Sequence, residues 1–126
     1  MQSTTLDLSA DVIDVRDIIA RVEEIKHEEW AGRATETLYV ERLDLQNILQ
    51  DLKGYGGDEQ YEGDWYPVTL IRESYFTEYT RELLIDCGDL PRKIPDYIEI
   101  DWDATARNIQ VDYSSVEIDG ATYWYR

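Results

Sequence analysis

The chain is short and strongly acidic: its 126 residues include 28 Asp and Glu against 12 Lys and Arg, a formal net charge of -16. That excess of acid argues against direct binding to nucleic acid or to an anionic membrane, because both select for basic side chains. The 10 Tyr and 4 Trp residues exclude a disordered acidic tail, in which aromatics are scarce, and indicate a single folded domain with an adequate core.

Residues 1–10 are expected to be a frayed lead-in, and they lack the basic region and apolar stretch of a secretory signal peptide. Residues 12–30 then predict an amphipathic helix. Asp14 is placed to cap it, and apolar residues such as Ile18 and Val22 follow at helical spacing. The opposite face of this helix is charged and faces solvent.

A second helix follows a break at residues 31–33. Thr35 or Thr37 can open this helix, and Gly54 stands where a C-terminal cap is expected. Two helices joined by so short a break pack side by side, so we expect residues 12–53 to form an antiparallel helical pair.

Residues 53–66 predict the one clear loop, since glycine and acidic residues dominate them. A β-rich run at residues 68–71 follows Pro67 and indicates a strand. Ser74 is expected to cap a third helix, which Gly88 ends.

The last third of the chain changes its period. Asp101 can cap a short helix, WDATARN, and residues 111–118 then have the pattern of an extended segment. Asp119-Gly120 is a strong hairpin signal, because both central residues of the favoured turn need positive φ. Residues 122–125 are the return strand.

Together these elements predict an α+β fold: an N-terminal helical hairpin, then a small antiparallel sheet of about three strands with one or two packed helices and a C-terminal Asp-Gly hairpin. We expect one domain, in which residues 67–126 form an α+β module. Side chains alternate between the two faces of a strand, so either Trp124, or Tyr123 together with Tyr125, should be exposed or covered by another chain. An open edge strand invites pairing, which predicts a homodimer through that strand.

Catalytic equipment is sparse, and we expect no enzyme, no cofactor and no metal site. The single histidine, His27, lies between Lys26 and Glu28 on the polar side of the first helix. Cys87 stands at a helix C-terminus, where the helix dipole opposes thiolate formation. The loop at residues 58–64 has oxygen ligands for calcium but lacks the spacing of an EF-hand.

The lone cysteine also excludes an intrachain disulfide and fits a reducing compartment, the cytoplasm of a cell. No apolar run approaches the roughly 18 residues that cross a bilayer.

The acidic residues are the better functional signal. A compact domain of this length is roughly 35 Å across, and duplex DNA of that length carries about 20 phosphates. The net charge of -16 is comparable in total. It would imitate DNA if it gathers on one stripe, whereas spread over the whole surface it would only keep an acidic protein soluble.

Residues 78–126 hold a helix that begins Glu-Tyr-Thr-Arg-Glu-Leu-Leu, then a Gly, a Pro, a Tyr-Ile-Glu-Ile-Asp-Trp-Asp-Ala segment and an acidic hairpin. In this order they resemble the C-terminal part of the ArdA-type antirestriction proteins. Residues 63–79, GDWYPVTLIRESYFTEY, are similar to a block in small acidic phage-encoded proteins of this type. The positions that carry the resemblance are Tyr79, Glu82, Leu83, Gly88, Pro91, Tyr97, Ile98, Asp101, Trp102, Ala104, Arg107, Asn108 and Ile109.

The resemblance implies an elongated string of small modules, encoded by a phage or mobile element, that imitates bent B-form DNA. It implies that the protein occupies the DNA groove of type I restriction-modification enzymes and dimerises through its C-terminal region. Full-length members of that family carry an N-terminal sheet module, and we expect no counterpart of it in this sequence.

We therefore expect the partner to be a basic DNA-binding protein in the host cytoplasm, a restriction-modification enzyme above all, whose Lys and Arg side chains meet carboxylates that stand in for phosphates. The alternative is an acidic adaptor that binds a basic protein without imitating DNA, marked by a compact acidic patch beside an apolar one. Asp101 has a structural explanation as a helix cap, and Asp119 has one as a turn residue. The expected contact acids are Glu23, Glu24, Glu28 and Glu29 in the first helix, Asp58, Glu59, Glu62 and Asp64 in the loop, and Asp96, Glu99, Asp101, Asp103, Asp112, Glu117 and Asp119 in the C-terminal module.

Overall fold

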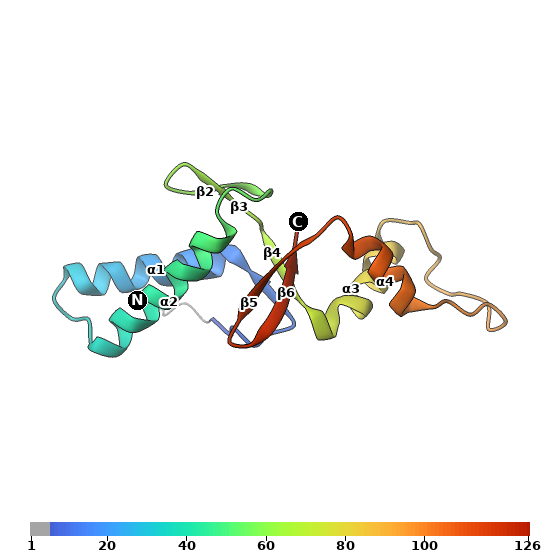
Figure 1. Ribbon diagram of the computed structural model, residues 1–126, viewed down its shortest axis with the longest axis horizontal. Helices are drawn as coiled ribbons and strands as arrows, with labels where there is room; N and C mark the ends of the chain where they lie inside the picture. Colours follow the sequence, from blue (N-terminus) through green and yellow to red (C-terminus); the bar gives the residue numbers. More distant parts are fainter. Residues whose placement is uncertain (1–5) are drawn as a thin grey trace.

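The computed structural model describes residues 6–126, and in that range four helices and six strands form an elongated α+β body (Figure 1). The α+β fold class is thereby confirmed. In chain order the elements are β1 (Val12–Asp14), α1 (Val15–Trp30), α2 (Glu36–Leu52), β2 (Asp58–Tyr61), β3 (Asp64–Tyr66), β4 (Thr69–Arg72), α3 (Glu73–Asp86), α4 (Trp102–Gln110), β5 (Ser114–Ile118) and β6 (Ala121–Tyr125).

The body has three layers stacked along its long axis. A four-stranded antiparallel sheet of order β1-β4-β6-β5 lies in the middle. Figure 1 shows the α1–α2 pair at one end, and α3 with α4 at the other. One hydrophobic core joins the first helical pair to the sheet, and a second core around Ile71, Phe76 and Ala106 joins α3 and α4 to the opposite face.

The sheet has four strands rather than about three, because residues 12–14 form a strand. The prediction that they belong to the first helix was wrong. They are extended and pair with β4, Val12 opposite Ile71 and Asp14 opposite Thr69. The physical reason is the cap itself. An N-cap residue takes extended backbone angles, and Asp14 has φ -86° and ψ 119°. The helix therefore begins after Asp14, and the β-branched residues before it are extended.

Three of the four expected helix caps are confirmed. Asp14, Thr35 and Asp101 each accept a hydrogen bond from a backbone N–H in the first turn of their helix, over 2.9, 3.3 and 3.0 Å. The side chain of Arg16 also donates to Asp14, and this lowers the pKa of the carboxyl. The expectation that Ser74 caps α3 was wrong. That helix starts at Glu73, directly after β4, and no side chain caps it.

The predicted antiparallel pair of α1 and α2 is confirmed. A turn at residues 31–35 reverses the chain, with Gly32 at φ +76°. The apolar stripe of α1 is fully buried against α2 and the sheet. The buried residues of the two helices are Val15, Ile18, Ile19, Val22 and Ile25 in α1, and Leu45, Leu49 and Leu52 in α2.

Residues 53–66 are only partly the loop that the sequence predicts, because β2 and β3 pair there as a separate two-stranded ribbon. Figure 1 shows this ribbon projecting from the side of the body. Tyr61 anchors it: Lys26 Nζ of α1 donates to Tyr61 Oη over 2.5 Å. The ribbon is also tied to its own base, since the Gln60 side chain donates to Tyr66 O over 2.7 Å.

The last strand, β6, lies inside the sheet between β4 and β5. Tyr123 and Tyr125 are buried in the first core, and Trp124 packs from the opposite face against the second. The expectation that one of these faces would be exposed or covered by another chain was therefore wrong, because the two helical pairs of the same chain cover both. The open edge that was to support a homodimer does not exist on β6, and a homodimer stays a prediction without that support.

Asp119 and Gly120 link β5 to β6 with φ of 51° and 82°, and Ile118 pairs with Ala121 across the turn. The lead-in assigned to residues 1–10 lies partly outside the described residues. Its described part, residues 6–10, is fixed to the sheet, because Tyr123 Oη donates to Leu8 O over 2.9 Å and to Ala10 O over 2.8 Å.

Candidate protein-binding surface

The acids expected to make contacts belong to all three layers and to the ribbon. The first four lie on α1, the next four on β2, β3 and their turn, and the remaining seven between α3 and the β5–β6 turn. Because these elements follow one another along the long axis in Figure 1, carboxylates occur from one end of the molecule to the other. Their local surroundings divide them into two classes.

On α1, the carboxylates are already held by arginines. Arg21 binds Glu24 and also Glu41 of α2, with 2.6 Å between Arg21 Nε and Glu41 Oε2. Arg42 of α2 binds Glu29. The Arg21–Glu41 and Arg42–Glu29 pairs join the two helices of the hairpin through their polar sides, and Glu24 holds Arg21 in place within α1, so both Glu24 and Glu29 have a structural explanation.

Glu28 has the same character at the end of α1. Arg33 Nε lies 2.9 Å from Glu28 Oε2, and this hydrogen bond lowers the pKa of the Glu28 carboxyl. The Glu28 side chain is partly buried. An incoming basic partner would have to displace Arg33 before it could bind there.

The base of the ribbon holds a second network. Lys26 Nζ is 3.7 Å from both Glu23 Oε1 and Glu62 Oε1, and the hydrogen bond to Tyr61 raises the pKa of Lys26. Burial is the main cause of the raised pKa of Tyr61. Asp64, at the start of β3, pairs with Lys53 over 3.2 Å. Six of the eight contact acids expected on α1 and the ribbon therefore have cationic neighbours.

The C-terminal acids are different. Among the described residues no Lys or Arg lies within ion-pair distance of them. Asp103 accepts a hydrogen bond from Thr77 Oγ1 over 3.1 Å, and Asp101 and Asp119 keep their roles as cap and turn. The exposed acids of this class are Asp96, Glu99, Asp101, Asp103, Asp112, Glu117 and Asp119, together with Asp58 and Glu59 of the ribbon.

Sequence reasoning missed a comparable set on α2. Glu36, Asp44 and Asp51 are exposed, and no ion pair holds them in the described part of the chain. The signal was present, since all three fall on the side of the helix opposite Leu45, Leu49 and Leu52.

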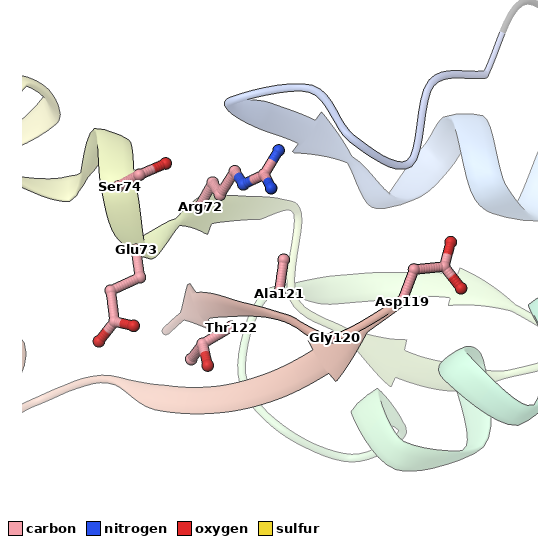
Figure 2. A pocket seen from close by; sticks show the side chains of 7 residues that line it. All are labelled: Arg72, Glu73, Ser74, Asp119, Gly120, Ala121 and Thr122. Carbon is pink, nitrogen blue, oxygen red and sulfur yellow. The ribbon is translucent and has the colours of Figure 1, made fainter.

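A shallow hollow of about 320 Å³ opens beside the β5–β6 turn (Figure 2). Arg72, Glu73 and Ser74 line it from the β4–α3 junction, and residues 119–122 line it from the hairpin. Figure 2 shows the carboxylates of Glu73 and Asp119 directed to different sides. Arg72 turns toward the N-terminal segment, where its Nη1 donates to Ser9 O over 2.7 Å. The polar groups thus do not converge on one point.

Within residues 6–126, no group of three His, Cys, Asp or Glu side chains is placed to hold a metal ion. Cys87 is exposed at the end of α3. None of the helices in that range has the length and apolar character that crossing a membrane requires.

Comparison with protein-family models, with curated proteins and with solved structures finds no match to this chain. The resemblance of residues 78–126 to the ArdA-type proteins stays a prediction.

Proposed function

We propose that the protein is an acidic inhibitor that imitates duplex DNA and occupies the DNA channel of a host DNA-binding defence enzyme. The observation that carries the proposal is the distribution of unpaired carboxylates along an elongated body, over α2, the ribbon, the sheet edge and the segment around α4. Such a distribution can meet the Lys and Arg residues of a channel at several points. The resemblance to ArdA-type proteins supports a type I restriction-modification enzyme as the target.

The two classes of carboxylate would contribute unequally. A carboxylate with no internal cation loses only water when it meets a Lys or Arg of the target. One already paired, such as Glu28 with Arg33, would have to exchange one ion pair for another, which yields little net free energy. The proposal therefore assigns the main phosphate-like role to the C-terminal acids and a minor role to those of α1.

Binding of this kind needs no catalysis. It would compete with DNA, associate rapidly at low salt and weaken as salt is added, because exposed charges are screened.

The direct test is a restriction assay. A type I enzyme and its substrate DNA are mixed at low salt with increasing amounts of the protein, and cleavage is followed. A variant with Asp96→Asn, Glu99→Gln, Asp103→Asn and Asp112→Asn should inhibit at least about tenfold more weakly, since each exposed pair is worth up to about 1 kcal/mol. The matched control, Glu23→Gln with Glu24→Gln, Glu28→Gln and Glu29→Gln, removes four paired acids of α1 and should lose much less.

Circular dichroism confirms that each variant is folded before it is assayed. Absence of inhibition by the unaltered protein in large excess would contradict the choice of target. Equal losses in the two variants would contradict the unequal roles of the acids.

The second candidate is the acidic adaptor, which the exposed Tyr39, Val40 and Leu43 of α2 favour. The enzyme, DNA and protein of the restriction assay also distinguish the adaptor from the DNA mimic. A DNA mimic is displaced from its target by duplex DNA, whereas an adaptor that binds elsewhere on a basic protein stays bound while DNA fills the channel.

A further inference from the structure

Helix α2 carries apolar side chains on two sides. Leu45, Leu49 and Leu52 are buried in the first core. Yet Tyr39, Val40 and Leu43 leave 47%, 48% and 39% of their surface exposed. A helix on the surface of a small domain normally has one apolar stripe and a polar remainder, so this second group calls for an explanation.

The three exposed residues form one continuous patch. Tyr39 and Leu43 are four residues apart, and Val40 and Leu43 are three apart, so their side chains are neighbours on the helix surface. We call this group the outer α2 face. Beside it, Glu36, Thr37 and Val40 line a shallow hollow of about 340 Å³. Scattered single apolar residues are common on protein surfaces, whereas contiguous apolar side chains offer a small surface that a partner can cover.

The charges around the outer α2 face have one sign. Glu36 and Asp44 are exposed beside it, Asp51 is exposed about two turns further along α2, and all three lack an ion pair in the described part of the chain. The nearest arginine, Arg42, lies 5.3 Å from the Tyr39 ring, but its guanidinium is bound to Glu29 and to Gln46 Oε1. A molecule that covers this patch therefore meets apolar groups bordered by uncompensated negative charge.

Apolar groups bordered by negative charge favour a basic helix over a second copy of this chain as the occupant of the patch. A second copy of the chain would bring its own Glu36, Asp44 and Asp51 against the same residues, and each copy has a net charge of -16. A helix with an apolar stripe bordered by Lys and Arg would instead satisfy both parts of the patch. We infer that the outer α2 face docks a basic amphipathic helix of a partner protein. This contact requires no imitation of DNA, so it is independent of the proposed DNA mimicry, and it gives the acidic-adaptor candidate a docking surface and a class of partner.

The test uses the whole chain and a synthetic helical peptide of Leu and Lys as probe, with a second peptide in which Ser replaces every Leu. Amide shifts in NMR spectra should move mainly along α2 with the Leu-Lys peptide. The Ser-Lys peptide should bind about tenfold more weakly, because burial of two or three aliphatic side chains is lost.

Two substitutions complete the test. Val40→Ser with Leu43→Ser should weaken the Leu-Lys peptide about tenfold. The control is Val111→Ser, at a site 80% exposed at the end of α4 and outside α2, and it should leave the affinity unchanged. Asp44→Asn with Asp51→Asn should also weaken the peptide and make its binding less sensitive to salt. Circular dichroism should show that each variant remains folded before its affinity is measured.

Equal binding of the two peptides would overturn the inference, and so would shift changes centred on residues 87–101 or on the ribbon. A dimer in sedimentation experiments that Val40→Ser with Leu43→Ser dissociates would also overturn it, by identifying a second copy as the occupant.

Discussion

Tyr123 packs its ring in the first core and donates hydrogen bonds from its hydroxyl to the backbone. Its ring is completely buried between the helical hairpin and the sheet, and burial is the main cause of its raised pKa. Its hydroxyl donates to the carbonyls of Leu8 and Ala10. Those carbonyls belong to a segment with no other regular structure, so this hydroxyl fixes the chain before β1.

Tyr123→Phe should lower the free energy of unfolding by about 1–2 kcal/mol, because two carbonyls lose their donor while the ring stays in place. Urea unfolding measures the change. Tyr97→Phe is the control, since Tyr97 is 87% exposed and should show no effect. Equal changes in the two variants would mean that the Tyr123 hydroxyl does not hold residues 6–10.

The ribbon of β2 and β3 depends on a close approach at its base. A Cβ at Gly57 would lie 1.9 Å from Tyr66 O and 2.7 Å from Pro67 Cα, both backbone atoms, and Gly57 has φ +67°. At the ribbon's turn, Gly63 has φ +79° but nothing within 4 Å of a Cβ. The two glycines thus share a left-handed backbone conformation, but only Gly57 lacks room for a Cβ atom.

Gly57→Ala should therefore destabilise the protein by about 3 kcal/mol, from backbone strain and steric overlap together. Gly63→Ala should cost only about 1 kcal/mol, from the left-handed backbone alone. Thermal unfolding followed by circular dichroism compares them. A larger loss at Gly63 than at Gly57 would contradict the packing of the ribbon base against residues 66–67.

Elements with a local signal could be predicted from the sequence, and those that depend on distant partners could not. The helical spacing in α1 and the caps at Thr35 and Asp101 were readable, because a helix is built from neighbours in sequence. The strands β1 and β3 have three residues each, too few to show a period. Strand β1 is defined by its pairing with β4, which follows more than 50 residues later, and β3 is defined by its pairing with the equally patternless β2 next to it.

The same distinction applies to the candidate surface. Which acids are neutralised depends on how α1 and α2 align, since Arg21 meets Glu41 across 20 positions and Arg42 meets Glu29 across 13. The sequence indicated an acidic surface but gave no means to separate paired acids from unpaired ones. The acids of α2 were missed for the related reason that their exposure follows from packing.

At the scale of the whole molecule, the excess of negative charge opposes compactness. In the described residues, eight of the twelve Lys and Arg residues form ion pairs. The carboxylates that are in none of these ion pairs repel one another. A long body with helices at its ends keeps the charges farther apart than a sphere would.

Added salt should therefore stabilise the fold. As NaCl rises from about 0.01 M to about 0.15 M, the screening length falls from about 30 Å to about 8 Å, and the urea midpoint should increase. Near pH 4.2, where the chain carries no net charge, the midpoint should lose this dependence. A midpoint that falls with salt at neutral pH would mean that the ion pairs outweigh the repulsion.

The interior position of β6 has a consequence for how the chain folds during synthesis. The helical hairpin, β1 and β4 leave the ribosome first, but the core that they share is completed by Tyr123 and Tyr125. The second core likewise awaits Trp124. Both cores therefore stay incomplete until residues 123–125 have emerged, and until then a growing chain presents two unfinished apolar faces to which chaperones can bind.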